Sequence, residues 1–330
     1  MAPVKNILIR LPNWLGDMVM ATSFVKAVQH QFAGSGVDVI AKKGMDQLLD
    51  YFPAHHEKYV FDKTQYPGIS GAIKFGRQIS KKKNYDIFFC LPDSFSSALM
   101  AKATKAKKVV GFKKEMRSFL LTHSFQKPKG LHRVEEYLYL LEQFCNIKIP
   151  VPPVELNHRE KEKKNYIVVN INSEAQSRRL PKEKAVSLLN HLRKSIPSDI
   201  VLIGSQKEAA WVNEILDALQ NKSGIINFAG QTRIPELIHC LAGASTVLTT
   251  DSGPAHVANA LGTYSIVLFG AGNENNTAPY NQANRKIIRL GKLPCEPCTK
   301  NTCVHYKLPE CLLQLDDNLV TSAVMQQLNS

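Results

Sequence analysis

Short apolar runs alternate along the chain with longer stretches whose apolar residues recur at helical spacing. The runs are rich in Val, Ile and Phe: NILIR, VDVIA, YDIFFCL and KKVVGF in the first half, then YIVVNI, DIVLIG, STVLTT and YSIVLFG in the second. Buried strands of a parallel sheet have this composition, and their alternation with helices is typical of βαβ units. The pattern therefore predicts an α/β fold with parallel sheets wrapped by helices.

A proline-rich stretch, NIKIPVPPVEL, separates the two halves. Its three prolines exclude a helix and cannot donate hydrogen bonds to a sheet, so residues 146–156 are predicted to form a stiff linker. A chain of 330 residues is long enough for two cores. We predict domains at 1–150 and 151–330, with the final helix a candidate to pack back on the first domain. Ligands would bind in a shared crevice at the carboxyl ends of the strands.

The net charge of the chain indicates what kind of partner it binds. There are 42 Lys and Arg against 28 Asp and Glu, which favours an anionic partner such as nucleic acid, a phosphorylated lipid surface or a nucleotide-linked substrate. The basic stretches at 101–117 and 81–83 fit either solvated faces or a patch facing an anionic acceptor or a membrane. Aromatic residues do not alternate with these lysines, so stacking on bases is not indicated.

The sequence shows neither a secretion signal at its start nor an apolar run long enough to span a bilayer. We expect a cytoplasmic protein, with peripheral contact to the inner face of the inner membrane left open.

The stretch LPNWLGDMVM places a lone carboxylate, Asp17, where the first strand gives way to a helix. One interpretation is a helix N-cap. The other is a general base at the edge of the crevice, accepting a proton from a substrate hydroxyl. Trp14 offers a flat apolar surface suited to a sugar or a lipid.

The stretch TTDSGPAHVANALG predicts a strand, a tight loop and a helix. Such a junction directs free backbone amides at a ligand and suits a pyrophosphate, which would lie near Asp251, Ser252, Gly253 and His256. The alternative is an ordinary capped helix in which His256 is a satisfied, partly buried histidine.

Two further strand ends in the second half carry charged residues. Arg178 precedes a helix opening at Pro181, where a guanidinium would neutralise a diphosphate leaving group or simply be exposed. Glu208 follows another strand and is placed to accept hydrogen bonds from ribose hydroxyls. These features indicate a nucleotide-binding domain that lacks the glycine-rich fingerprint of dehydrogenases and the Lys-Ser/Thr loop of phosphate hydrolases.

Four of the seven cysteines crowd near the C-terminal end with the spacing C-x2-C-x4-C-x7-C: Cys295, Cys298, Cys303 and Cys311. Four thiolates in so short a span fit a tetrahedral structural zinc or iron site. Free thiols in a loop are the alternative. A structural role is favoured over a catalytic one.

Several motifs together resemble one family. The segments RLPNWLGDMVMATSFVKAV, YDIFFCLPDSFSSAL, VVGFKKEMRSFLLTH, HRVEEYLYLLEQF, TTDSGPAHVANALG and LPCEPCTKNTCVHYKLPEC resemble the ADP-heptose:lipopolysaccharide heptosyltransferases, glycosyltransferase family 9, and above all its type II members. The resemblance implies a GT-B fold, with two Rossmann-like domains facing a central cleft. It also implies inverting transfer of L-glycero-D-manno-heptose from ADP-heptose to a lipid A-Kdo-heptose acceptor, the inner core of lipopolysaccharide. No cofactor is expected to be required for catalysis.

The resemblance also assigns roles to residues. Asp17 matches the family's proposed general base, and Arg178 falls where the family usually has a lysine, while Leu180 replaces an expected tryptophan. The cysteine-rich segment resembles a cysteine finger of some relatives. The remaining positions implied for the donor are Ser173, Glu208, Asp251, Ser252, Gly253 and His256, and those for the acceptor side are Asp93, Ser94 and Ser97.

Two other functions stay open. The nearer one is a family 9 transferase with another acceptor, such as a type I or type III enzyme or a protein heptosyltransferase. The other is a basic, non-enzymatic protein that binds nucleic acid or membrane phosphates, which explains the charge but gives Asp17 and the DSGPAH segment no purpose.

Overall fold

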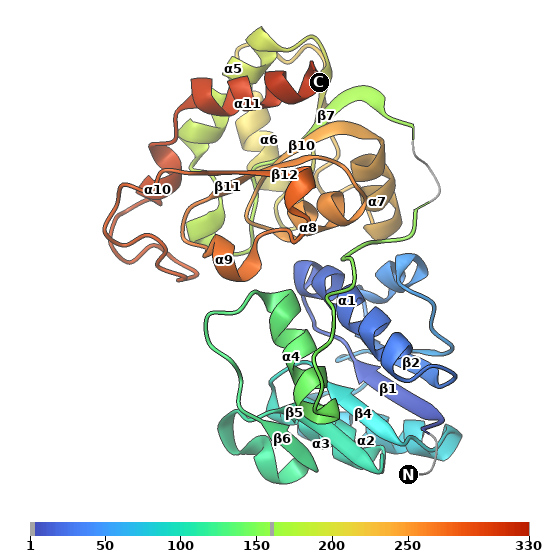
Figure 1. The fold of residues 1–330 in the computed structure, drawn as a ribbon. Helices are drawn as coiled ribbons and strands as arrows, with labels where there is room; N and C mark the ends of the chain where they lie inside the picture. The colour runs from blue at the N-terminus through green and yellow to red at the C-terminus, as the bar shows by residue number, and fades with distance from the viewer. Residues whose placement is uncertain (1–3, 159–161, 330) are drawn as a thin grey trace. The chain divides into compact units, whose positions relative to one another are not determined.

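The structure, a computed structural model, describes residues 4–158 and 162–329. The chain divides into two compact units, Met1–Asn157 and His158–Ser330, and each contains one six-stranded sheet (Figure 1). All neighbouring strands in both sheets run parallel. The predicted α/β fold with two Rossmann-like parallel sheets is confirmed.

The first unit has the strand order β3-β2-β1-β4-β5-β6, which is the Rossmann order. Its strands are β1 Asn6–Arg10, β2 Gly36–Lys42, β3 Lys58–Phe61, β4 Ile87–Cys90, β5 Lys108–Phe112 and β6 His123–Phe125. Its helices are α1 Leu15–Gln31, α2 Gly68–Lys82, α3 Phe95–Ala103 and α4 Arg133–Cys145, with short 3-10 turns η1 Asp46–Tyr51 and η2 Glu115–Leu120.

The second unit repeats this order as β12-β11-β10-β7-β8-β9. Its strands are β7 Lys164–Asn170, β8 Asp199–Leu202, β9 Ile225–Asn227, β10 Ala244–Thr250, β11 Ser265–Phe269 and β12 Arg285–Arg289. Its helices are α5 Lys182–Ser195, α6 Ala209–Asp217, α7 Ile234–Gly243, α8 Gly253–Ala260, α9 Glu274–Thr277, α10 Glu310–Leu313 and α11 Asp317–Leu328, with turns η3 Gln176–Arg178 and η4 Gln282–Asn284.

Alternating side chains of the inner strands bury against helices on both faces of each sheet. In β4, Phe88 packs in the core formed with α2 and α3, while the ring of Phe89 meets Phe24 of α1 at 5.3 Å and Phe144 of α4 at 5.5 Å. Burial on both faces explains why the inner strands are almost wholly apolar.

The sheet order creates a switch point in each unit, between β1 and β4 in the first and between β7 and β10 in the second. Connections leave the two central strands in opposite directions there, and ligands of such folds bind beyond the carboxyl ends of these strands.

The proline-rich stretch 146–156 contains no regular element and packs along α1. Ser23 Oγ donates to the carbonyl of Pro152 at 2.7 Å, Lys26 pairs with Glu155, and Asn157 N donates to Tyr51 O at 2.8 Å. The stretch therefore belongs to the first unit.

The final helix, α11, contributes Val320, Ala323 and Val324 to the core of the second unit. Lys184 of α5 pairs with Asp317 at its start at 2.6 Å. Within the described ranges, none of the helices has the length and apolar character needed to cross a bilayer.

Candidate active site

Asp17 lies in the first turn of α1, just beyond the carboxyl end of β1. The N-cap of this helix is Trp14, so the interpretation of Asp17 as N-cap is wrong, although its charge still complements the helix dipole. The Asp17 side chain is 25% exposed, and its Oδ1 lies 3.6 Å from Nε of Arg133 on α4. The carboxylate is thus held by a guanidinium and remains open to a ligand.

Arg133 is the second member of a chain of charges that crosses the switch point. Its Nη1 lies 2.8 Å from Oε1 of Glu136, one helical turn further along α4. Nζ of Lys127 lies 2.9 Å from the same oxygen and 2.7 Å from Oδ2 of Asp93. Five alternating charges therefore connect Asp17, after β1, with Asp93, after β4.

Tyr137 is buried beside this chain. Burial, and next the charge of Asp17, raises the pKa of its phenol well above the usual value, so the hydroxyl stays protonated. Sequence reasoning assigned no role to Tyr137, Arg133, Glu136 or Lys127. In the HRVEEY segment, however, Arg133 and Glu136 are three residues apart, and this spacing places two side chains on the same side of a helix.

The other acceptor-side residues have structural contacts of their own. Ser94 is the N-cap of α3, where its hydroxyl accepts from the backbone N–H of Ser97 at 3.3 Å and lies 2.6 Å from the Ser97 hydroxyl. Trp14 is 58% exposed at the start of α1. The structure therefore gives Ser94 and Ser97 a helix-capping role and leaves Trp14 available at the surface.

Two arginines that the sequence did not single out are buried at the same strand ends. Arg10 donates to the carbonyls of Leu11 at 2.6 Å and Ile40 at 3.2 Å, and burial lowers its pKa to about 10. Arg117 is fully buried and bonds carbonyls after β4 and β5. Both brace the backbone around the switch point.

In the second unit, Asp251 follows β10 and Arg178 follows β7, and the fold brings them together. Nη1 of Arg178 lies 3.1 Å from Oδ2 of Asp251, a side chain that is 5% exposed. Burial raises the pKa of Asp251 to about 6, against the opposing effects of Arg178 and Arg289. Gly272 makes room for this carboxylate, because a β-carbon there would stand 1.9 Å from Oδ2.

The helix that follows, α8, starts at Gly253 with Ser252 as its N-cap. The Ser252 hydroxyl accepts from Nδ2 of Asn170 at 2.8 Å and donates to the carbonyl of Thr250 at 3.1 Å, so it is fixed by the strand ends. His256 lies in α8 and is 6% exposed. The predicted strand, loop and helix are all present, and Arg178 and Asp251 lie beside the start of the helix.

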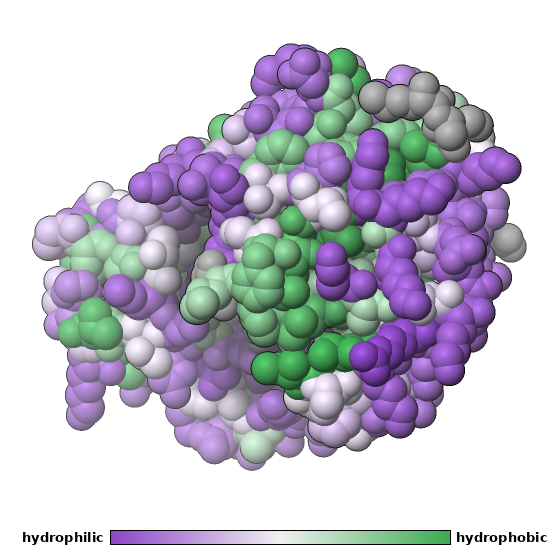
Figure 2. All heavy atoms as spheres, turned by 90° about the horizontal axis from the view of Figure 1, so that it is seen from below, coloured by the Kyte–Doolittle hydropathy of each residue, from purple (hydrophilic) through white to green (hydrophobic). Residues whose placement is uncertain are grey.

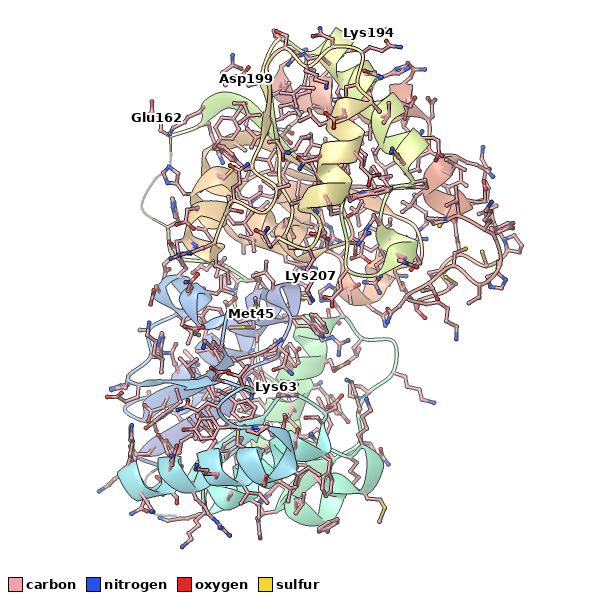
Figure 3. The ribbon with its side chains drawn as sticks, turned by 180° about the vertical axis from the view of Figure 1, so that it is seen from behind. Met45, Lys63, Glu162, Lys194, Asp199 and Lys207 are labelled. Atoms are coloured by element: carbon pink, nitrogen blue, oxygen red, sulfur yellow. The ribbon has the colours of Figure 1, made fainter. Side chains whose placement is uncertain are left out.

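The remaining donor-side residues are held by their own loops. The carbonyl of buried Ser173 accepts two hydrogen bonds from Arg179, at 3.0 and 3.2 Å. The carboxylate of Glu208 accepts from the backbone N–H and the hydroxyl of Ser205, both at 2.8 Å, next to Lys207, which Figure 3 labels. Glu208 thus ties the β8–α6 loop together.

Leu180, which stands where the resembled family has tryptophan, is buried in the core of the second unit. Its backbone N–H donates to the carbonyl of Ile171 at 3.1 Å. A leucine therefore fills this position without opening the packing beside Arg178.

The cysteine-rich loop lies against the same region. Cys295, Cys298, Cys303 and Cys311 line one small pocket together with Ser177 and Glu296. The backbone N–H of Ser177, next to Arg178, donates to Asn301 O at 3.1 Å, and Thr299 N donates to Ala271 O at 2.8 Å. The loop therefore supports the backbone on both sides of the Arg178–Asp251 pair.

Burial, followed by the neighbouring charges of Glu296 and the other cysteines, raises the pKa of Cys311 to about 12. In the ranges 4–158 and 162–329, no three His, Cys, Asp or Glu side chains are arranged to hold a metal ion.

Comparison with known proteins agrees with this architecture. The model of glycosyltransferase family 9 (heptosyltransferase) matches residues 72–308. Lipopolysaccharide heptosyltransferase 2 of Escherichia coli K12 is 28% identical over 314 residues, 86% of this chain and 88% of that protein. Lipooligosaccharide heptosyltransferase 2 of Campylobacter jejuni serotype O:6 is 26% identical over 307 residues, 90% and 92% of the two chains.

Solved structures extend the likeness to the fold. E. coli ADP-heptose LPS heptosyltransferase II superposes with a TM-score of 0.82 at 24% identity, covering 98% of both chains. A family 9 glycosyltransferase from Veillonella parvula gives 0.84 at 20% identity, covering 99% of this chain and 98% of its own. With the family model matched over well more than half of the sequence, the chain belongs to glycosyltransferase family 9 and is a heptosyltransferase.

Proposed function

We propose that this heptosyltransferase moves heptose from ADP-heptose to the heptosyl-Kdo inner core of lipopolysaccharide, with inversion at the anomeric carbon. The type 2 relatives support this choice of acceptor, and the likeness to E. coli ADP-heptose LPS heptosyltransferase II supports the donor. The observation that carries the proposal is Asp17, a partly exposed carboxylate held by Arg133 at the switch point of the first unit.

In the proposed reaction, an oxygen of Asp17 accepts the proton of an acceptor hydroxyl. The hydroxyl oxygen forms a bond to the anomeric carbon of the donor heptose as the bond from that carbon to the ADP oxygen breaks. The bonding electrons leave with ADP, and attack from the opposite face inverts the configuration. Arg133 acts as a positioning residue, because it compensates the charge of Asp17 and fixes its direction.

The second unit binds the donor in this scheme. Arg178, the backbone N–H of Gly253 and the dipole of α8 offset the negative charge that grows on the departing diphosphate. The buried Asp251 holds the Arg178 guanidinium in place at 3.1 Å. Because burial weakens screening by water, this pair orients the cation more firmly than an exposed pair would.

The acceptor is tested by incubating the enzyme with ADP-heptose and two truncated lipopolysaccharides, one ending in Kdo and one ending in heptosyl-Kdo. The mass of the product should increase by one heptose only on the heptosyl-Kdo acceptor. Transfer to the Kdo acceptor would instead support a type I enzyme, and transfer to neither would contradict an inner-core acceptor. Asp17→Asn serves as the control for background hydrolysis of the donor.

We also propose that Cys295, Cys298, Cys303 and Cys311 hold a structural zinc or iron ion. The shared pocket supports a cation there, although the four sulfurs would have to draw together into a ligand set. No step of the transfer depends on this ion.

Metal analysis of freshly purified, reduced protein should find close to one ion per chain. Cys298→Ser should lose it and Cys145→Ser, which lies outside the cluster, should keep it. A metal content near zero in the unmodified protein would contradict the proposal.

A further inference from the structure

The turn η2, between β5 and β6, exposes two large apolar side chains. Met116 is 81% exposed and Phe119 is 69% exposed, the highest values among the large hydrophobic residues that the structure describes. The half-buried ring of Phe95 at the start of α3 lies 6.3 Å from the ring of Phe119. Such exposed apolar side chains lose their contact with water only when another segment or another molecule covers them.

The turn cannot fold inward to hide them, because Arg117 between them is fully buried. Its Nε donates to the carbonyl of Phe112 at 3.0 Å, and its Nη1 donates to those of Pro92 at 2.6 Å and Ser94 at 3.3 Å. Leu120 and Leu121 then enter the core of the first unit. The turn is therefore anchored at its centre and at its end, with Met116 and Phe119 held outward.

Positive charge surrounds this pair. Lys113 and Lys114 directly precede the turn, and Lys102 and Lys105 lie at the end of α3, which packs against it; all four are exposed. Among the side chains that the structure describes, none of these four lysines is ion-paired, whereas Lys107 pairs with Asp86 at 2.8 Å. Four exposed, unpaired cations thus lie on the segments around the apolar pair.

Figure 2, which views the structure from below Figure 1, shows hydrophobic residues gathered between hydrophilic ones on the side turned to the viewer. Helix α2 packs against α3 and carries further exposed basic residues, Lys74, Arg77 and Lys81. We call Met116 and Phe119, with Lys102, Lys105, Lys113 and Lys114, the basic-apolar face.

We propose that the basic-apolar face binds the surface of an anionic membrane, with Met116 and Phe119 entering the interfacial region and the lysines contacting lipid phosphates. Charge complementarity selects this occupant: outward apolar side chains ringed by unpaired cations match an anionic bilayer surface. A second copy of the chain would bring like charges together. Nucleic acid would satisfy the lysines but leave Met116 without an apolar environment.

The surface stands independently of the transfer reaction, but its position suits the proposed function. Arg117 joins the turn to the carbonyls of Pro92 and Ser94, on either side of Asp93. An acceptor anchored in a membrane by its lipid would be presented on the same unit as the acceptor-side residues.

Vesicle sedimentation tests the proposal with the full chain. The unmodified protein should bind vesicles of phosphatidylglycerol and phosphatidylethanolamine, should not bind phosphatidylcholine vesicles, and should bind less as salt is added. The double variant Met116→Ser, Phe119→Ser should bind at least about tenfold more weakly. Lys113→Gln with Lys114→Gln should weaken binding by about fivefold per lysine.

Matched controls come from the second unit. Leu319→Ser with Met325→Ser, and Lys194→Gln with Lys292→Gln, remove exposed residues of the same kinds and should bind like the unmodified protein; Lys194 is labelled in Figure 3. Transfer to a water-soluble acceptor should be unchanged in the Met116 and Phe119 variant, which separates this proposal from the proposed function.

Three outcomes would overturn the proposal. One is equal weakening by the control variants, which would indicate diffuse attraction by net charge. Another is binding to duplex oligonucleotides in place of vesicles. The third is a concentration-dependent dimer that the Met116 and Phe119 variant abolishes.

Discussion

The two units share one strand order but differ in the environment of the acid at their switch point. In the first, Asp17 is 25% exposed and belongs to a chain of alternating charges shared with Arg133, Glu136, Lys127 and Asp93. In the second, Asp251 is 5% exposed, and burial raises its pKa. A scaffold that appears twice thus supports one carboxylate that is partly exposed and another that is enclosed.

The difference follows from what surrounds each strand end. Helix α4 brings Arg133 of its first turn to Asp17 beyond the end of β1, so this guanidinium and the solvent compensate the charge of Asp17. Around Asp251, the close approach of Gly272 excludes water and leaves Arg178 as the nearest cation. This difference supports the proposal that the first unit supplies a proton acceptor and the second a rigid binding site for an anion.

The pH dependence of stability tests the burial of Asp251, and its effect is the largest change in stability that we expect. Because its pKa in the folded protein is about 6, the folded state binds a proton between pH 4 and 6 that the unfolded chain has released. The free energy of unfolding therefore falls as the pH rises through this window, by about 3 kcal/mol. Asp251→Asn should lack that decrease, so its stability relative to the parent should rise from pH 4 to pH 7.

Denaturation curves followed by Trp211 fluorescence, in a Trp14→Phe background, report the second unit alone. If the free energy of unfolding varied with pH in the same way for the parent and Asp251→Asn, this acid would not be enclosed. The two units would then not differ in the exposure of their acids.

Loss of the cation paired with Asp251 should weaken donor binding. We expect Arg178→Ala to raise the dissociation constant of ADP by about 10-fold to 100-fold, because a charge-assisted contact to a diphosphate is lost. As a control, Lys182→Ala removes a nearby exposed cation that pairs with Glu214, and it should leave the dissociation constant of ADP unchanged. Calorimetric titration with ADP measures both, and equal affinity in Arg178→Ala would remove this residue from the donor site.

A change at Arg133 should affect the rate of the reaction step and not the binding of the donor. Arg133→Gln removes the charge beside Asp17, and we expect kcat to fall by about tenfold, while Arg133→Lys restores part of the rate. The dissociation constant of ADP should stay constant, since Arg133 lies in the first unit. An altered ADP affinity with unchanged kcat would reverse the assigned roles of the two units.

Ser94 should have the smallest effect, on stability alone. Ser94→Ala removes the N-cap of α3 and should cost about 1 kcal/mol of unfolding free energy in the first unit. Denaturation followed by Trp14 fluorescence in a Trp211→Phe background measures this, with Ser118→Ala as the control. A raised KM for the acceptor at unchanged stability would instead make Ser94 a substrate contact.

The inner strands of both sheets were predictable from the sequence, and all four edge strands were missed. Residues of β4 are buried throughout, whereas β3, β6, β9 and β12 contain half-buried or exposed positions along most of their length. An edge strand pairs on one side only and is less enclosed, so it need not be an apolar run. The hydrophobic pattern identifies strands through burial and weakens where burial is incomplete.

The site residues show a similar division. Asp17, Arg178 and Asp251 lie in the segments that follow inner strands, and parallel topology places such segments at the switch points. The partner of Asp17 could not be found in this way, because Arg133 lies more than a hundred residues further along the chain. Their contact depends on how α4 packs against α1, which local sequence does not encode.

The rate of heptose transfer by Asp17→Asn, measured by product mass at saturating ADP-heptose, tests the division of roles most directly. Asparagine keeps the size of the side chain but cannot accept the proton. We expect kcat to fall by about 100-fold to 10,000-fold while the affinity for ADP stays unchanged. A kcat close to that of the parent enzyme would contradict it.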